Sequence, residues 1–546
     1  MTADVTAETR LRRNIRATLM PGFVGTDLPG WLRERLRNGL GAVCLFGQNI
    51  TSPHQLRALT AAILAANPHA VIAIDEEGGD VTRLYFSSGS PYPGNAILGR
   101  IDDIAYTEEV GRQVGWELRK AGCTLTFAPD TDVNSNPDNP VIGVRSFGTD
   151  PTRVGLHSAA WVRGLQSTGV AACPKHFPGH GDTALDSHLA MPVVDVPLAT
   201  LRERELVPFR AAIAAGAKTV MTSHILLPQI DPEHPATLSP GVLGGLLRAE
   251  LGFDGVIVSD ALDMAGASGT LGIPGAAAAA LAAGCDLLCI GTENTAEQLD
   301  RIEAAVLAAV DAGTLPPGRL ADAADRVHRL AVGTLASTRA VPLPASAQGG
   351  AEPTFDSARI SGSFAVNEHA ERWLAAAPGA APGAAPGMAL AAAPDVGPGA
   401  APGAAPDVGP GAAPGAAPGA FSVVRLDTVS NIAVGGAPWG PFAEVAAHPG
   451  SDLAVWWRAR QVVGRGSGDT AELVLPAGEP VLVIGKDNHR HPFIRDLVDT
   501  LRAERRDVLV VDMGWPSDDL AYADIATYGA SRLAGRALLN MLAAAP

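Results

Sequence analysis

The stretch "GVIVSDAL", Gly255 to Leu262, decides how the fold of this chain is interpreted. A short apolar run ends abruptly, and Ser259 and Asp260 follow it directly. Continuous short apolar runs are typical of strands that are buried on both faces of a parallel sheet. Because an aspartate is also a common helix cap, the rest of the chain must decide what Asp260 does.

Seven more runs of this kind, with amphipathic helical stretches between or after them, occur between about residue 16 and residue 340. Alternation of buried strands with helices predicts a parallel α/β sheet, and eight units suit a closed (β/α)₈ barrel of the TIM type. A doubly wound open sheet is the alternative. The strand candidates are "ATLMPGF", "GAVCLFGQN", "AVIAIDEEGG", "TLTFAPDTDV", "VAACPKHFPG", "KTVMTSHI", "GVIVSDAL" and "CDLLCIGT".

Polar residues at the ends of these runs favour the barrel. The active face of such a barrel is built from the carboxyl ends of several strands. Helix caps would explain one or two of the polar pairs, but not five strands together. The pairs are Asp75 and Glu76, Asp130 and Asp132, Lys175 and His176, Ser223 and His224, and Ser259 and Asp260.

The composition changes beyond Arg339. The stretch from Ala376 to Ala420, here called the tether, is a Pro-Ala-Gly repeat that we expect to be extended or disordered. Strand-like "ARISGSFAV" and "FSVVRLDTV" flank it, so the tether either interrupts a second domain or separates two. The later segments "EPVLVIGKD", "DVLVVDMG" and "SRLAGRALLNMLA" predict a smaller α/β sandwich domain.

These patterns predict a catalytic barrel at 1–340, a linker and start of the C-terminal domain at 341–375, the tether at 376–420 and the C-terminal sandwich at 421–546. The segment "VLVIGKDNHRHPF" is no phosphate loop, because it lacks the glycine spacing and the Lys-Ser/Thr pair. We expect the C-terminal domain to have a packing or partner-binding role.

Charge and terminal sequence limit the partners. With 41 basic and 57 acidic residues, the net charge of −16 argues against nucleic acid and anionic membranes. The N-terminal stretch has no apolar signal segment, and no run reaches the roughly 18 apolar residues of a membrane span. We expect a cytoplasmic protein, whose oligomeric state the sequence does not indicate.

The densest polar stretch is "KHFPGHGDTALDSH", Lys175 to His188. A metal site, a glycine-rich anion cradle and a proton-transfer loop over a sugar are the three hypotheses. We expect no metal, because Lys175 would place a cation beside it and the spacing matches no metal motif. The hypothesis of an anion cradle is weak, because no phosphate-loop lysine follows "PGHGDT". A metal site would use His176, His180, His188, Asp182 and Asp186.

The third hypothesis needs a carboxylate on another strand, and Asp260 supplies one. Retaining glycoside cleavage uses one carboxylate as nucleophile and a second group as proton donor. The segment Asp186-Ser187-His188 offers an imidazole that an aspartate can orient, and imidazole titrates near neutral pH. The alternatives are a helix cap at Asp260 and a solvated loop histidine at His188.

Six motifs, in order between about residues 15 and 335, resemble the β-N-acetylglucosaminidases of glycoside hydrolase family 3. They are "DEEGGDVTR", "VRSFG", "KHFPGHGDTALDSH", "VMTSHILLP", "HPATLS" and "GFDGVIVSDALDMAGA". The C-terminal part resembles, more loosely, the second α/β domain of the longer members. The resemblance implies a retaining, exo-acting enzyme without metal or organic cofactor, which removes terminal β-linked N-acetylglucosamine from cell-wall-derived or related oligosaccharides.

The same resemblance implies roles for single residues. Asp260 would be the nucleophile, His188 the acid/base and Asp186 its partner. His180 and Asp182 are expected to hold the turns of their own loop. Asp80 stands where many members have arginine, which leaves the leaving-group preference open. The sugar would be bound by Asp75, Arg83, Arg145, Lys175 and His176.

Water or inorganic phosphate could accept the sugar from the covalent intermediate. A carboxylate acid/base would repel phosphate, since two unit charges about 4 Å apart interact with about 4 kcal/mol at an effective dielectric of 20. A neutral His188 removes that repulsion, so a phosphorylase is the alternative to a hydrolase. A catalytically inactive sugar-binding protein is disfavoured, because both catalytic elements are present.

Overall fold

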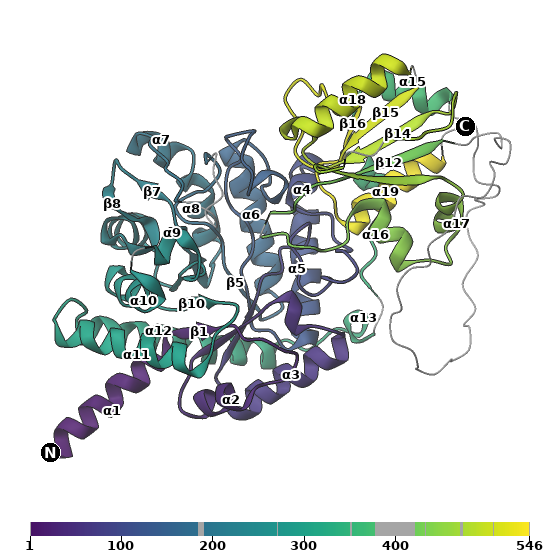
Figure 1. Ribbon diagram of the computed structural model, residues 1–546. Coiled ribbons are helices and arrows are strands. Elements are labelled where there is room, and N and C mark those ends of the chain that lie inside the picture. Colours follow the sequence, from purple (N-terminus) through teal and green to yellow (C-terminus); the bar gives the residue numbers. More distant parts are fainter. Residues whose placement is uncertain are drawn as a thin grey trace.

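The computed structural model describes residues 2–183, 191–269, 271–349, 352–376, 421–431, 433–469, 473–505 and 507–544. Figure 1 shows a barrel surrounded by helices and, beside it, a smaller sheet with helices on both faces. The tether, apart from Ala376, lies outside the described residues.

Each predicted run contributes one short strand to the barrel. These are β1 (Leu19–Pro21), β2 (Ala42–Leu45), β3 (Val71–Ile74), β4 (Leu125–Thr126), β5 (Ala171–Ala172), β6 (Thr219–Met221), β9 (Val256–Val258) and β10 (Leu288–Gly291). Strands β2 to β5 pair in order, β6 pairs with β9 and β10 with β1, all in parallel.

Single bridges and packing close the remaining gaps of the ring. The bridge Phe177–Thr222 joins the end of β5 to β6, and Val258–Leu287 joins β9 to β10. Strand β1 packs beside β2. The strands therefore form a closed ring, which confirms the predicted (β/α)₈ barrel over the open sheet.

Helices surround this ring because their apolar faces pack on the buried strands. Local capping sets their ends: the Ser52 hydroxyl accepts the Gln55 N–H at the start of α3, and α5 ends at Gly122 with φ 84°. The helices are α1 (Thr2–Ala17), α2 (Gly30–Arg37), α3 (Pro53–Ala66), α4 (Asn95–Ile101), α5 (Ile104–Ala121), α6 (Pro151–Gln166), α7 (Leu198–Glu203), α8 (Leu206–Ala214), α9 (Ala265–Ser268), α10 (Gly272–Ala283), α11 (Ala296–Asp311) and α12 (Pro317–Ala340), with a π-helical segment at Gly241–Glu250.

A small antiparallel hairpin follows β6 and was not predicted. It consists of β7 (Leu226–Leu227) and β8 (Asp231–Pro235). Strand β7 has only two residues and β8 is mostly polar, so neither shows an alternating pattern in the sequence. No described helix is long and apolar enough to cross a membrane.

The second domain is built on one mixed sheet. Its order is β11-β16-β15-β14-β12-β13, with β11 antiparallel to β16 and the other pairs parallel. Strand β11 precedes the tether and β12 follows it, so the tether interrupts this domain. The strands are β11 (Ala365–Val366), β12 (Ser422–Asp427), β13 (Val462–Gly466), β14 (Val481–Gly485), β15 (Val508–Asp512) and β16 (Ile525–Ala526).

The strand prediction for "ARISGSFAV" is only partly right. Helix α14 (Ser357–Ser361) occupies its first part, because the Asp356 side chain accepts the Ala358 N–H and caps a helix there. Only its last two residues belong to β11. The remaining short helix before it is α13 (Ala345–Gln348).

Helices cover both faces of this sheet. Helix α18 (Pro492–Glu504) packs on one face, and α19 (Arg532–Ala543) packs on the other. Ile97 of barrel helix α4 is buried in the same apolar cluster as α19, so the two domains share a core. The other helices are α15 (Glu368–Ala376), α16 (Gly440–Ala447) and α17 (Asp452–Arg458).

Candidate active site

A cavity of about 270 Å³ lies at the carboxyl ends of the barrel strands and is here called the sugar pocket. Asp75 follows β3, Lys175 follows β5 and Asp260 follows β9. The predicted residues that line it together are Asp75, Arg83, Arg145, Lys175, His176 and Asp260. The predicted acid/base pair, Asp186 and His188, lies outside the described residues.

Lys175 is the centre of a buried charge network. Its Nζ lies 2.6 Å from Asp75 Oδ1 and 2.7 Å from Glu77 Oε1. Burial would raise the pKa of Asp75, but the charges of Lys175 and Arg83 lower it below its usual value. The pKa of Lys175 is raised, because both carboxylates outweigh its burial. The pocket thus holds a fixed anion and a fixed cation, the partners that sugar hydroxyls need.

Arg145 is held by Glu77, which the sequence reading missed. Arg145 Nε donates to Glu77 Oε2 at 3.0 Å, and Nη2 donates to Oε1 at 2.7 Å. Burial opposes ionisation of Glu77, but Arg145 and Lys175 lower its pKa. Such a two-point pair fixes the plane of the guanidinium. Glu77 could have been found from its place two residues after Asp75 in "DEEGG".

The second domain completes the wall of the sugar pocket. Arg83 Nη2 donates to Asp75 Oδ2 at 3.0 Å and to the backbone carbonyl of Ala433 at 2.7 Å. Ala433 follows β12 and lines the pocket. No sequence signal points to Ala433, because every residue carries a backbone carbonyl.

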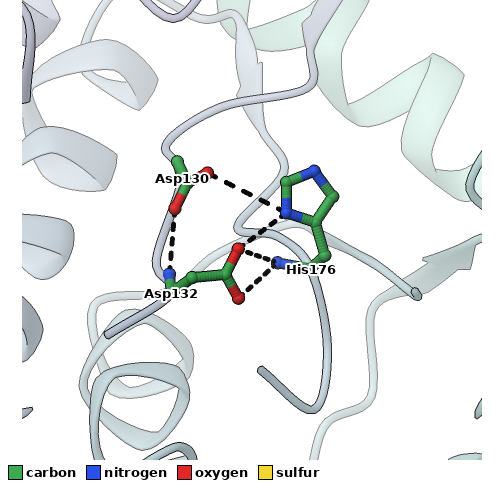
Figure 2. A group of neighbouring side chains, drawn as sticks. All are labelled: Asp130, Asp132 and His176. Carbon is green, nitrogen blue, oxygen red and sulfur yellow. Dashed lines mark hydrogen bonds and ion pairs between the residues drawn. The ribbon is translucent and has the colours of Figure 1, made fainter. Parts of the chain in front are cut away.

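Asp132 sets the orientation of His176 (Figure 2). His176 Nδ1 lies 2.7 Å from Asp132 Oδ2, and Asp132 Oδ1 accepts the backbone N–H groups of His176 and His180 at 3.2 and 2.7 Å. Burial and the charges of Arg145 and Lys175 lower the pKa of His176 well below its usual value. His176 is therefore neutral, with Nδ1–H directed to Asp132, and its Nε2 accepts a hydrogen bond from Arg145 Nη2 at 3.4 Å.

One group of side chains near the pocket has the inventory of a metal site. Asp130, Asp132 and His176 place ligand atoms within 4.8 Å of one another. However, Arg145 Nη2 lies 3.5 Å from Asp130 Oδ2, where it supplies a positive charge. Burial and the charge of Asp132 also raise the pKa of Asp130 well above its usual value, which favours a protonated carboxyl. This arrangement disfavours a metal, whose absence stays a prediction.

Two other residues of the hypothetical metal site, His180 and Asp182, have partners elsewhere. His180 Nδ1 lies 2.8 Å from Thr183 Oγ1 in its own turn, as expected, although His180 also lines the sugar pocket. Asp182 instead pairs with Arg204, the residue that follows α7, at 2.6 Å. Asp182 does not line the sugar pocket, and its ion pair ties the loop to the end of α7, so its role in the turns of the loop stays a prediction.

Asp260 does not cap a helix. The helix that follows, α9, begins at Ala265 with Met264 as its flanking residue. Asp260 is half-buried and lines the sugar pocket, and its Oδ1 accepts the N–H of Ala261 at 2.8 Å. The position after β9 thus presents a carboxylate to the pocket.

Other polar residues at strand ends support the loops. His224 bonds through Nδ1 to Thr237 Oγ1 at 2.9 Å and through Nε2 to the Ala261 carbonyl at 3.0 Å. Ser259 Oγ accepts the Cys289 N–H at 3.0 Å. Both side chains are buried, and neither lines the sugar pocket.

Asp80 lies between the two domains. Its Oδ1 accepts the N–H of Ala530 at 2.8 Å, and burial raises its pKa. It lines a second cavity, between the barrel and the second domain, but not the sugar pocket.

Comparison with known proteins identifies the family. The model described as "Glycosyl hydrolase family 3 N terminal domain" matches residues 32–330. A beta-hexosaminidase of Stenotrophomonas maltophilia is 39% identical over 320 residues, which is 56% of this chain and 95% of that protein. A beta-hexosaminidase of Pseudomonas aeruginosa is 38% identical over 311 residues, 56% of this chain and 90% of that protein.

A solved structure extends the likeness to both domains. The glycoside hydrolase family 3 beta-N-acetylglucosaminidase of a Paenibacillus species shares 28% identity with a TM-score of 0.74, over 98% of this chain and 96% of that one. The barrel and the second domain therefore have the arrangement of a glycoside hydrolase. The chain belongs to glycosyl hydrolase family 3.

Proposed function

We propose that the protein is a retaining, exo-acting β-N-acetylglucosaminidase that removes terminal β-linked N-acetylglucosamine. The observation that carries this proposal is the sugar pocket, which Asp260 lines together with the ion-paired Asp75, Lys175 and Arg83. The similar proteins are named beta-hexosaminidases and a beta-N-acetylglucosaminidase, which supports N-acetylglucosamine as the sugar. Cell-wall-derived oligosaccharides remain the proposed substrates, and a cytoplasmic location remains a prediction.

The pocket residues bind the terminal sugar. The ionised Asp75 accepts hydrogen bonds from ring hydroxyls, and Lys175 and Arg145 donate to hydroxyl or carbonyl oxygens. The neutral His176 lines the pocket, and its Nε2 holds Arg145 Nη2 at 3.4 Å, which helps to fix that guanidinium. Because ion pairs and Asp132 fix these groups, the sugar meets a preformed set of partners and its anomeric carbon is oriented toward Asp260.

Asp260 acts as the nucleophile. Its carboxylate attacks the anomeric carbon, the bond to the leaving oxygen breaks and a glycosyl ester forms. We propose His188, oriented by Asp186, as the group that protonates the leaving oxygen and then takes a proton from the incoming water. Attack by water on the ester returns the sugar with its original configuration.

The wall at Ala433 supports exo action. Its backbone carbonyl binds Arg83 on the side of the second domain. A wall there favours a pocket that takes one terminal sugar over a groove that accepts a long chain.

Hydrolysis of an aryl β-N-acetylglucosaminide, with the anomer of the released sugar followed by NMR, tests the proposal. The β-anomer should appear first and mutarotate later. First release of the α-anomer, or no release of sugar, would refute it. Relative rates on chitobiose and on a cell-wall disaccharide identify the substrate class.

Inorganic phosphate remains the alternative acceptor, because a neutral histidine acid/base would not repel it. The same assay with millimolar phosphate distinguishes the two reactions. Free N-acetylglucosamine as the main product indicates a hydrolase, whereas N-acetylglucosamine 1-phosphate indicates a phosphorylase.

A further inference from the structure

We propose that the cavity between the two domains binds an oxyanion through Lys486, beside the sugar that the proposed function places in the sugar pocket. The oxyanion is a carboxylate or phosphate group, carried by the leaving group or supplied as free phosphate. The proposal therefore rests on the proposed function for the sugar and adds a preference for what lies next to it.

The position of the cavity makes it a subsite. It has a volume of about 520 Å³, which lies within the usual range of about 300–1,000 Å³ for small-molecule sites. Val141 and Arg145 line both this cavity and the sugar pocket. Ala433 lines the sugar pocket, and Asn431 and Val434 beside it line the cavity. A group attached to the bound sugar therefore has the cavity next to it.

Of the four lysines of the chain, Lys486 is the one that lines this cavity. Lys120 pairs with Glu117, and Lys175 pairs with Asp75 and Glu77. Lys218 is exposed, at the opposite end of the barrel.

Lys486 is half-buried and lines the cavity, with Nζ 5.2 Å from the centre of the Trp439 ring. No carboxylate of the described residues forms an ion pair with it. Its charge attracts Asp80 across the cavity and opposes the rise in the pKa of that carboxyl. Because the two side chains form no ion pair, an anion in the cavity can bind the ammonium directly.

The two carboxylates of this cavity are directed to backbone donors. Asp80 accepts the N–H of Ala530, and Asp487 Oδ1 accepts the N–H of Trp515 at 2.9 Å. Their hydrogen-bonding capacity is thus partly used, and burial raises the pKa of Asp80 toward its neutral form. They therefore compete weakly with an incoming anion.

Two further features make the same wall positive. Arg490 lines the cavity, where its Nη1 lies 3.9 Å from Asp487 Oδ1 and its Nη2 donates to the Pro137 carbonyl at 2.5 Å. Its buried Nε has no hydrogen-bond partner among the residues that the structure describes and remains available to a negative group. Helix α18 begins at Pro492, directly after the lining residue His491. The positive end of its dipole lies on this wall, which favours a negative group.

The experiment compares substrates that differ in one charge. A disaccharide of N-acetylglucosamine linked to muramic acid carries a free carboxylate, and its methyl ester does not. For Lys486→Met we expect kcat/KM to fall roughly 10-fold or more for the acid, and less than about twofold for the ester and an aryl glycoside. Lys218→Met makes the same charge change on an exposed surface and should leave all three values unchanged.

The same rates measured with added inorganic phosphate distinguish the two sources of the oxyanion. If Lys486→Met abolishes acceleration by inorganic phosphate and leaves the acid-to-ester ratio unchanged, the cavity binds the acceptor phosphate. If neither the ratio nor the phosphate response changes, the proposal is wrong. An equal fall on every substrate also overturns it, because that result indicates a general structural effect.

Failure of the proposed function gives a different result. In that case the wild-type protein cleaves none of the three substrates. Calorimetric titration of the acid disaccharide and of phosphate into wild type and Lys486→Met then measures oxyanion binding directly. Weaker binding of either by the variant supports the oxyanion site, and equal binding of both rules it out.

Discussion

Asp75 in the barrel and Asp512 in the second domain occupy the same topological position, since each stands at the carboxyl end of a parallel strand. Asp75 bonds to the side chains of Lys175 and Arg83. Asp512 instead accepts three backbone N–H groups, from Asp487, Asn488 and Gly514, at 2.8, 2.9 and 2.7 Å.

The partners decide the charge and the use of each carboxyl. The cations around Asp75 overcome its burial and lower its pKa, whereas burial and the charge of Asp487 raise the pKa of Asp512 to about 7. Backbone donors hold a loop in place and leave little capacity for a ligand. Side-chain cations hold a carboxylate ionised in an open pocket, where it can bind substrate.

The largest effect is expected for Asp260→Asn. The amide cannot form the glycosyl ester, so kcat should fall by at least about 1,000-fold on an aryl β-N-acetylglucosaminide. Asp512→Asn is the matched change at a strand end of the second domain, and its kcat should stay within a few-fold of wild type. Near-normal activity of Asp260→Asn would remove the distinction between the two positions.

A smaller effect is expected for Arg83→Lys. Lysine cannot reproduce the contacts of the guanidinium with both Asp75 and the Ala433 carbonyl. The KM for the aryl substrate should rise about 10-fold, with a lesser change in kcat. Arg536→Lys, at the Glu444 pair inside the second domain, is the control and should leave KM unchanged. Equal KM values for both variants would show that the wall at Ala433 does not help to bind sugar.

The pH dependence of stability tests the structural carboxyls. Burial raises the pKa of Glu76 to about 7, from 4.5, although its Oε2 accepts the N–H groups of Arg83 and Leu84. The stability contributed by the bound proton is complete below pH 4.5 and is lost as the pH rises through 7, by on the order of 3 kcal/mol. Thermal unfolding at pH 5 and pH 8 should show a smaller decrease for Glu76→Gln than for wild type. An equal decrease would contradict this.

Removal of metal should have the smallest effect. Because Arg145 lies beside Asp130, we expect EDTA to leave turnover unchanged. Loss of activity that a divalent cation restores would make Asp130, Asp132 and His176 a metal site instead.

Local sequence patterns were sufficient to predict the barrel and the strand-end residues of the sugar pocket, whereas Arg83 and Arg145 were predicted only from the family resemblance. Apolar runs and their polar ends identify the strands, and the ends of β3, β5 and β9 bring Asp75, Lys175 and Asp260 together because parallel strands share one edge. Capping residues are equally local, although Asp356 shows that they can convert a strand-like segment into a helix.

Features that depend on contacts between distant segments could not be predicted in this way. The Ala433 carbonyl, the Asp80 bond to Ala530 and the Asp182 pair with Arg204 arise only when separate elements pack together. The same holds for the cavity at Lys486, since its walls come from two domains and not from one phosphate loop.

Identification of the residue that bonds to the sugar tests the central claim most directly. The protein is incubated with a fluorinated N-acetylglucosamine donor that forms the glycosyl ester but hydrolyses slowly, and its peptides are analysed by mass spectrometry. We predict one added sugar on the peptide that carries Asp260, and none in Asp260→Asn. A sugar on another carboxylate, or no covalent adduct while the donor is still turned over, would contradict the account.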